Sequence, residues 1–532
     1  MMSEAAIRDD DAPARQSTQR KFLILVTLSL ISSLIMLDSN IVAVALPSIA
    51  RSLGANFTEI EWVVSAYILP FAALLLAAGA YADRHGRKLA MLIGITLFTV
   101  ASGICGMASS ALMLNLARAL QGVGASLLLT ASMAVINHTF SGAERARAYA
   151  FWGACQGIAI TCGPIIGGAI TTFLGWRWAF LMNLPICLVL FAAACLAVHE
   201  SSDHEAKRLD YAGIVTFSGG LFCLIWALID GNGVGWSSHE ILALLGGAAV
   251  LLVAFYFVEA RQQRPMIDFS LFRRPTFLGS AFAMLGYAGG AQVLIFFLPL
   301  LLQNAYGYAP AAAGLAMLPF ALPMFLTPRF GARLASRYSG RTLLTLALAI
   351  TAAGNALMHL LAGSRASYPV FAIGMFIAGI GAGMLNSESV KVMQGAVPAQ
   401  RAGMASGITA TTRFVGLLVG VAALGAVLAA GVSRRFMASA DLHGLDTGLV
   451  AAAARRVASG DINGVIGALG MQAQDAIHAA AAAAFAGGFA DTSLIAAGVA
   501  AISCMLAFVL VRAAETAPAK GKQAAALAPA ME

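Results

Sequence analysis

The sequence predicts an all-α polytopic membrane protein, in which two six-helix bundles related by a pseudo-twofold repeat and two inserted helices make 14 transmembrane spans. Of the 532 residues, 60% are hydrophobic and 11% are charged, and the mean hydropathy is +0.82. Apolar runs long enough to cross a bilayer, about 20 residues each, follow one another along the chain. Two segments also recur at a fixed offset in span number. These features exclude a soluble enzyme, a nucleic-acid-binding protein and a disordered chain.

Apolar runs of about 18 to 26 residues, separated by charged or turn-rich breaks, define the candidate spans. They cover residues 22–46, 60–79, 89–108, 112–136, 147–170, 178–198, 212–230, 240–258, 277–302, 309–327, 341–362, 368–390, 404–431 and 492–512. The run that begins at Phe22 is too long for the h-region of a signal peptide, so we expect it to be retained as the first span. The seven cysteines lie inside apolar runs without a metal-ligand pattern, so no metal site is expected.

The basic residues predict the orientation of the chain. With a cytoplasmic N-terminus, 24 of the 33 Lys and Arg residues lie in inner segments and tails, seven lie in outer loops, and Arg118 and Arg413 lie within spans. Four of the seven outer residues belong to one long loop, which contributes little to the positive-inside rule. This distribution explains the net charge of +8 without a nucleic-acid partner. The even span number places both termini in the cytoplasm.

An internal repeat predicts the domain organisation. GAYADRHGRK at 79–88, between spans 2 and 3, recurs in weakened form as FGARLASRYSGR at 330–341, between spans 10 and 11. The segment that opens span 5 at 144–168 recurs at 400–425, which opens span 13. Both recurrences are eight spans apart, as two six-span halves separated by two extra spans would give. A duplicated helical bundle of this kind is typical of secondary transporters, whose substrate site lies between the halves.

The repeat divides the chain into five predicted regions. These are a cytoplasmic tail at 1–21, an N-terminal six-helix bundle at 22–198, a linker with two extra helices at 199–276, a C-terminal six-helix bundle at 277–512 and a cytoplasmic tail at 513–532. The second bundle includes a long outer loop at about 432–490. This Ala-rich loop is expected either to form one or two amphipathic helices at the outer surface or to be a variable insertion without a role in transport. The C-terminal tail is expected to be disordered.

Four motifs resemble the major facilitator superfamily, and within it the fourteen-span drug:proton antiporters of the EmrB/QacA type. The resemblance covers nearly the whole chain, and WRWAFLMNLP at 176–185 matches the family's junction between spans 5 and 6. The motifs are GxxxDRxGRK (Gly79, Asp83, Arg84, Gly86, Arg87, Lys88), LxxxRxxQGxG (Leu114, Arg118, Gln121, Gly122, Gly124), GPxxGG (Gly163, Pro164, Gly167, Gly168) and LDxxxVxVALP (Leu37, Asp38, Val42, Val44, Ala45, Leu46, Pro47). The chain departs from the family at Ala159, where a Gly is usual, and at Asn40, where many members have a β-branched residue.

The resemblance implies a proton-coupled multidrug efflux antiporter. Such a protein exports lipophilic, including cationic, compounds across the bacterial inner membrane by alternating access, and it is not an enzyme. It needs no cofactor because the proton gradient drives it, and the Walker motif of ATP-binding proteins is absent from the sequence. Its expected partners are small-molecule substrates, protons and the lipid bilayer. Some relatives also pair with a periplasmic adaptor and an outer-membrane channel, which the long loop could contact, but no residue here identifies them.

Two other functions stay open. An exporter of one specific metabolite or siderophore would share these motifs, and a growth screen with dyes, quaternary ammonium compounds and antibiotics separates it from a multidrug exporter. A proton-linked nutrient importer is the second alternative. GPxxGG resembles the motif of exporters and argues against it, and the direction of solute flux decides.

Asp38 and Arg118 are the candidate proton-coupling residues. Asp38 is the only carboxylate predicted to lie well inside a span, and a charge there costs a few kcal/mol or more unless it is paired, hydrated or protonated. At 1.5 Å per residue, Asp38 lies roughly 12 Å and Arg118 roughly 9 Å from the outer ends of their spans. We expect both to face the cavity at one level, so that their separation switches proton affinity. The alternative interpretation is a static ion pair that fixes helix packing.

The GPxxGG motif predicts a bent and closely packed fifth span. Pro164 cannot donate to the carbonyl of Ile160. Gly163 and Gly167 form a small-xxx-small face. In the antiporter interpretation Gly168 completes a hinge; otherwise the glycines serve packing alone.

The GxxxDRxGRK loop lies at the predicted cytoplasmic mouth. The resemblance implies a gating latch, in which Asp83 caps a neighbouring helix end and holds the inner gate closed in one state. The alternative interpretation is positive-inside anchoring with a solvated acid.

Polar and aromatic residues on spans 1, 2, 4, 9 and 12 are candidates for the substrate cavity. An apolar cavity with few fixed polar groups would favour loose recognition of amphipathic compounds. A residue of this kind, taken alone, more often serves packing or an interhelical hydrogen bond. The candidates are Asn40, Trp62, Tyr67, Gln121, Tyr287, Gln292 and Asn386.

Overall fold

A computed structural model describes residues 18–202, 210–262, 267–397, 402–439, 450, 453–454, 456–458 and 474–516. Every regular element in these ranges is helical. In chain order they are α1 (Thr18–Leu53), α2 (Phe57–His85), α3 (Arg87–Gly106), α4 (Ala111–Thr139), α5 (Gly142–Phe173), α6 (Trp178–Leu181), α7 (Asn183–Ala197), α8 (Tyr211–Val234), α9 (His239–Arg261), η1 (Phe269–Arg273), α10 (Pro275–Tyr287), η2 (Ala288–Gln292), α11 (Leu294–Asn304), α12 (Pro310–Leu315), α13 (Leu318–Leu334), α14 (Gly340–Gly363), α15 (Tyr368–Gly395), α16 (Ala402–Met437) and α19 (Gln474–Leu510).

These elements make 14 segments that are long and apolar enough to cross a membrane, as the sequence predicts. Three of the segments are composite: α6 with α7, α10 with η2 and α11, and α12 with α13. The middle of the second is the π-helix η2, which follows from the flexible Ala-Gly-Gly sequence at its start. The protein is therefore an all-α, multi-pass membrane protein. An even number of passes puts the start of α1 and the end of α19 at the same end of the bundle, called here the terminal end.

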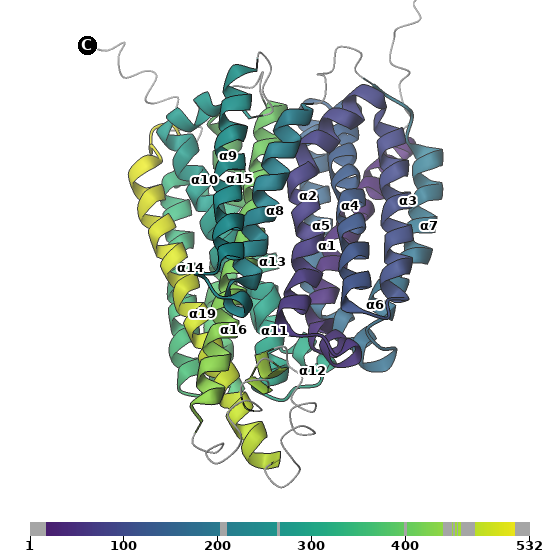
Figure 1. Cartoon of the computed structure of the whole chain (residues 1–532). Coiled ribbons are helices and arrows are strands. Elements are labelled where there is room, and N and C mark those ends of the chain that lie inside the picture. The colour runs from purple at the N-terminus through teal and green to yellow at the C-terminus, as the bar shows by residue number, and fades with distance from the viewer. Residues whose placement is uncertain are drawn as a thin grey trace, which may run out of the picture.

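The helices form two halves that meet along a central seam (Figure 1). In the first half α2 packs on α4, α1 on α5 and α3 on α4; in the second, α14 packs on α15 and α19, and α16 on α19. Across the seam α2 packs on α16, α5 on α12 and α1 on α11. Figure 1 shows the first half on the right and the second half on the left. The cavity and charged groups considered below lie along this seam.

The inserted pair α8 and α9 packs as a hairpin against the outside of the seam. α8 contacts both α2 of the first half and α16 of the second. Asn232 of α8 donates from Nδ2 to the carbonyl of Ala426 in α16 over 2.6 Å. The inserted pair therefore contacts both halves through α8.

The expectation of a long loop at 432–490 is wrong at both of its ends. α16 continues to Met437, and α19 begins at Gln474, well before the expected start of the last span. The cause is the alanine run at 479–484, because alanine has the highest helix propensity of all residues. Arg435 and Asp491 also join the two helices through hydrogen bonds of 2.6 and 2.9 Å. Most of the segment between these helices, where amphipathic helices were expected, lies outside the described residues, as does the tail after residue 516.

Candidate functional site

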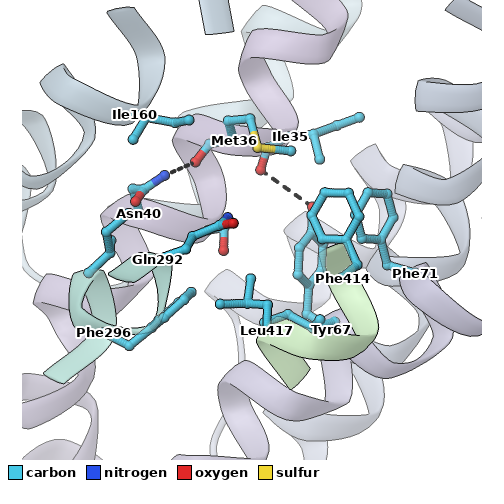
Figure 2. A pocket seen from close by; sticks show the side chains of 13 residues that line it. Ile35, Met36, Asn40, Tyr67, Phe71, Ile160, Gln292, Phe296, Phe414 and Leu417 are labelled. Atoms are coloured by element: carbon cyan, nitrogen blue, oxygen red, sulfur yellow. Dashed lines mark hydrogen bonds between the residues drawn. The ribbon is translucent and has the colours of Figure 1, made fainter. Parts of the chain in front are cut away.

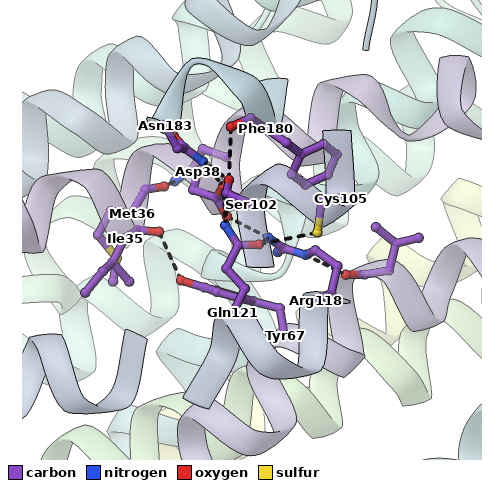
Figure 3. Close-up of polar contacts among 12 residues, drawn as sticks. Ile35, Met36, Asp38, Tyr67, Ser102, Cys105, Arg118, Gln121, Phe180 and Asn183 are labelled. Atoms are coloured by element: carbon purple, nitrogen blue, oxygen red, sulfur yellow. Dashed lines mark hydrogen bonds and ion pairs between the residues drawn. The ribbon is translucent and has the colours of Figure 1, made fainter. Parts of the chain in front are cut away.

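Asp38 and Arg118 form an ion pair in the interior of the first half (Figure 3). Asp38 of α1 is 0% exposed and Arg118 of α4 is 1% exposed, and Arg118 Nη1 lies 2.6 Å from Asp38 Oδ2. The other carboxylate oxygen, Oδ1, accepts hydrogen bonds from Gln121 Nε2 at 3.0 Å and from Asn183 Nδ2 at 2.7 Å. Ser102 of α3 accepts from the same Asn183 amide at 2.9 Å. Residues of four helices, α1, α3, α4 and α7, thus form one polar network around the Asp38 carboxylate.

Arg118 has its remaining contacts within the same half. Its Nε donates to the carbonyl of Val63 in α2 at 3.1 Å, and its Nη1 also donates to Gln121 Oε1 at 2.7 Å. The guanidinium lies over the ring of Tyr67, with Cζ 4.1 Å from the ring centroid. A cation and two amide donors thus surround the Asp38 carboxylate in this conformation.

The expectation that Asp38 and Arg118 face the cavity is wrong for this conformation. They lie at one level, as their 2.6 Å contact shows, but they do not line the space between the halves. Tyr67 lies between the ion pair and the cavity, because its ring lies against Arg118 and also lines the cavity. The physical reason is that the amides of Gln121 and Asn183 hold the Asp38 carboxylate inside the first half, where Arg118 also bonds the Val63 carbonyl.

A cavity lies on the seam and draws its lining from both halves (Figure 2). The empty space within it is about 410 Å³, including the part that is open to solvent. Most of its wall is aliphatic or aromatic. Its residues are Ile35, Met36, Ser39, Asn40, Tyr67, Ile68, Phe71, Ile160, Gln292, Ile295, Phe296, Phe414 and Leu417. Such a lining suits lipophilic molecules held by shape and apolar contact.

The structure places three of the seven predicted cavity residues in this lining, namely Asn40, Tyr67 and Gln292. Asn40 is held by its own helix, because Nδ2 donates to the carbonyl of Met36 over 2.6 Å. Tyr67 donates from its hydroxyl to the carbonyl of Ile35 over 3.4 Å. Both polar groups are therefore partly satisfied before a substrate arrives.

The other four predicted cavity residues lie elsewhere in this conformation. Gln121 belongs to the Asp38 network. Trp62 packs against Phe222 and Trp226 of the inserted helix α8, with ring centroids 6.3 Å apart in both pairs. Tyr287 and Asn386 bond to each other over 3.1 Å inside the second half.

Arg413 of α16 is a charge beside the cavity to which the sequence assigns no role. Its Nε donates to Oε1 of Gln292, a lining residue, over 2.9 Å, and its Nη2 donates to the Tyr287 hydroxyl over 3.4 Å. Its guanidinium also lies 5.7 Å from the ring centroid of Phe414, another lining residue. These partners are all neutral. The charged group that contacts the lining from the second half is thus a cation, Arg413.

The glycines of GPxxGG pack α5 against two different neighbours. A Cβ at Gly167 would come within 2.8 Å of Ile41 Cα, and a Cβ at Gly163 would overlap Asn40, so these two glycines seat α5 on α1. A Cβ at Gly168 would overlap the carbonyl oxygen of Pro310 in α12. The contact is reciprocal, because a Cβ at Gly314 in α12 would overlap the carbonyl oxygen of Pro164. The motif therefore serves packing within the first half and contact across the seam at once.

The loop between α2 and α3 differs from the expected latch in this conformation. Asp83 pairs with Arg87 four residues along, at 2.8 Å, and caps no helix among the described residues. The N-terminus of α3 is instead capped by Glu200, whose carboxylate accepts from the backbone N–H groups of Lys88 and Leu89, both at 3.0 Å. The Lys88 ammonium donates to the carbonyl of Cys195 over 2.7 Å. A carboxylate is favoured at this place because helix N-termini carry unpaired donors and a partial positive charge.

Replacing Glu200 with Ala is expected to lower the apparent unfolding temperature of the purified protein. The variant leaves the two backbone donors without their acceptor, and a lost helix N-cap typically costs about 1 kcal/mol. Thermal unfolding in detergent, followed by intrinsic fluorescence, measures the effect. Glu144→Ala is the matched control, since it removes an exposed ion pair with Lys21, and exposed pairs contribute little. Equal unfolding temperatures for Glu200→Ala and the wild type would contradict the capping role.

Sequence reasoning missed three residues of these sites. Asn183 lies inside the WRWAFLMNLP segment, and its amide in an otherwise apolar run is the signal that could have identified it. Ser102 carried no signal, because serines in apolar helices commonly bond their own backbone. Glu200 lies three residues after the end of the sixth span, and nothing in the local sequence indicates that it returns to the start of α3.

The chain matches the model of the Major Facilitator Superfamily over residues 28–421. It belongs to the Major Facilitator Superfamily. Multidrug resistance protein Stp of Mycobacterium tuberculosis is 34% identical over 416 residues, which cover 78% of this chain and 77% of Stp. The puromycin resistance protein pur8 of Streptomyces alboniger is 30% identical, covering 80% of this chain and 85% of pur8.

Solved structures of other transporters share the fold of this superfamily member. A bacterial homologue of the human lysosomal transporter Spinster, in its inward-facing and unoccupied conformation, superposes with a TM-score of 0.58 at 17% identity. The match covers 93% of this chain and 99% of the other. The protein is thus a membrane transporter of the superfamily with drug-resistance relatives, and its 14 spans fit the fourteen-span type of drug exporter.

Proposed function

We propose that this transporter is a proton-coupled efflux antiporter for lipophilic drugs, cationic ones included, which works by alternating access. The observation that carries the proposal is the buried Asp38–Arg118 pair, which Tyr67 links to the cavity, since its ring lies against Arg118 and lines the cavity. A substrate that displaces Tyr67 would disturb Arg118, and separation of the pair would change the affinity of Asp38 for a proton. The drug-resistance relatives support the same substrate class.

The proposal includes the setting of the protein. We place it in the bacterial inner membrane with the terminal end of the bundle in the cytoplasm, on the strength of the distribution of Lys and Arg. Protons then enter from the outer end, and substrate leaves there. An adaptor and an outer-membrane channel remain predicted partners that no contact in the described residues identifies.

The test is ethidium movement in inside-out membrane vesicles under an imposed pH gradient. Vesicles that contain the transporter should accumulate ethidium when their lumen is acidic, and a protonophore should abolish the accumulation. Vesicles from cells without the protein are the control. Accumulation that ignores the gradient, or movement of dye in the opposite direction, would contradict antiport.

A second candidate function is export of one neutral or anionic metabolite, and Arg413 is the observation that favours it. The guanidinium contacts the lining residue Gln292, and its partners among the described residues are neutral, so it repels a cation in the cavity. The name of pur8, a relative, also refers to resistance to one compound. A growth screen that pairs cationic dyes with neutral and acidic antibiotics separates the two functions.

Replacing Arg413 with Gln is expected to shift selectivity toward cations. The variant removes the charge and keeps a donor for Gln292, so resistance to ethidium should rise relative to resistance to an acidic compound. The measurement is the ratio of the two minimum inhibitory concentrations. Arg341→Gln is a control, because Arg341 stacks on Phe508 away from the cavity lining. An unchanged ratio would show that Arg413 does not select substrates by charge.

A further inference from the structure

Glu61 of α2 is a buried acid on the seam that the proposed mechanism does not use. Glu61 is 6% exposed, and its Oε1 has no hydrogen-bond donor among the described residues. It lies one turn into α2, at the end of the bundle opposite the terminal end. An unpaired carboxylate in such a place is costly, and buried acids in membrane helices are functional candidates for that reason.

The neighbours of Glu61 come from both halves and from the inserted pair. Its carboxyl group touches the backbone of α16 at Gly425, where an added Cβ would overlap Oε1 and lie 2.7 Å from the carboxyl carbon. Asp230 of α8 is close enough to repel a negative charge on Glu61. Asp230 itself accepts from Trp226 Nε1 over 2.6 Å, and Trp226 packs on Trp62, next to Glu61 in the chain. The acid is therefore enclosed by α2, α8 and α16.

The charged groups on the surrounding helices offer Glu61 no positive partner. Among the described residues the acids nearby are Asp230 and, behind it on α9, Glu240, while Glu59 of α2 caps its own helix. The cations have other partners: Arg118 pairs with Asp38, Arg413 bonds Gln292 and Tyr287, and Arg434 and Arg435 pair with Asp491. The closed seam therefore accepts Glu61 when its carboxyl group is neutral. The contact with Gly425 leaves room for a proton and not for an organic cation.

We propose that Glu61 is a second proton-binding group, whose protonation is required for α2 and α8 to close against α16. When the halves separate at this end, water reaches Glu61 and the acid can release its proton. When they close, the proton must be in place, so binding of the proton and closure stabilise each other. Acid on this side of the membrane therefore favours the closed seam. The inference rests on the proposed function in one respect, namely that the proton is the driving ion.

The test measures closure directly and not transport. Spin labels at Met107 and Ser364, exposed positions of the two halves at this end, report their separation in the purified full-length protein in lipid nanodiscs. The background has the native cysteines replaced by serine. Wild-type Glu61 is expected to shift the distance distribution toward the short, closed population as pH falls from 8 to 5. Glu61→Gln, which mimics the neutral acid, is expected to keep the short population at every pH.

Three further results decide the proposal. Asp230→Asn is expected to move the midpoint of the shift to lower pH, because it removes the negative neighbour that favours proton binding. This variant tests the proposal if Glu61→Gln does not fold. A Glu61→Gln protein that titrates like the wild type overturns the proposal. A shift that follows Na⁺ concentration at constant pH also overturns it and assigns the site to a metal cation. Asp38→Asn should keep the titration, so loss of drug transport in that variant tests the proposed function separately.

Discussion

Replacing Asp38 with Asn is expected to reduce ethidium accumulation driven by a pH gradient to the level of vesicles without the transporter. Asparagine cannot carry the proton, and it can still accept hydrogen bonds from the Gln121 and Asn183 amides. The variant should therefore retain exchange of labelled for unlabelled substrate, which needs no gradient. Loss of gradient-driven uptake with retained exchange is the signature of lost coupling, as opposed to lost binding.

Folding is the main complication, and a double variant controls for it. Asp38→Asn leaves the buried Arg118 without its counter-charge, and breaking a buried pair in this way typically costs about 3–5 kcal/mol. Asp38→Asn with Arg118→Gln makes the site neutral again and should recover much of that stability while staying unable to couple. Gradient-driven uptake in either variant at the wild-type rate would mean that the pair only fixes helix packing.

Replacing Gly168 with Leu is expected to give a folded protein without transport. The Cβ alone would overlap the Pro310 carbonyl and lie 3.0 Å from Ala311 Cα, so a leucine holds α5 and α12 apart across the seam. Both halves keep their own cores, because neither contact lies within a half. Ethidium efflux should fall to background while size-exclusion chromatography shows a monodisperse protein.

Two other glycines on α5 provide matched controls for this prediction. Gly153→Leu should leave efflux near the wild-type rate, since no atom lies within 4 Å of the position of its Cβ. Gly167→Leu presses on Ile41 inside the first half and should lower stability as well as transport, by about 1–3 kcal/mol for an overpacked site. Full efflux by Gly168→Leu would show that the contact between α5 and α12 does not take part in the cycle.

The sequence predicts the membrane fold well because hydropathy is a local property. A helix in lipid must satisfy its own backbone, so each apolar run of sufficient length predicts one span, and all 14 are present. Boundaries are less predictable: the sequence predicts a loop before Asp491, yet the helix propensity of the alanine run there extends α19 to Gln474.

The sequence predicts site residues only where a motif and the depth of the residue along its span point to the same position. Asp38 and Arg118 have comparable depths on their spans, and they do pair. Their partners Asn183 and Ser102 come from other helices, and a sequence without contact information does not bring them together. Depth along a span also does not predict burial by other helices. Glu61 is near a helix end by sequence, but α8 and α16 cover it.

The most direct test of the coupling claim is proton release from the purified transporter when substrate binds. The protein is placed in weakly buffered detergent solution with a pH-sensitive dye, and ethidium is added. The account predicts that the wild type releases protons on binding and that Asp38→Asn releases fewer, leaving only the share that Glu61 contributes. No release from the wild type, or equal release from both proteins, would contradict proton–drug exchange through Asp38.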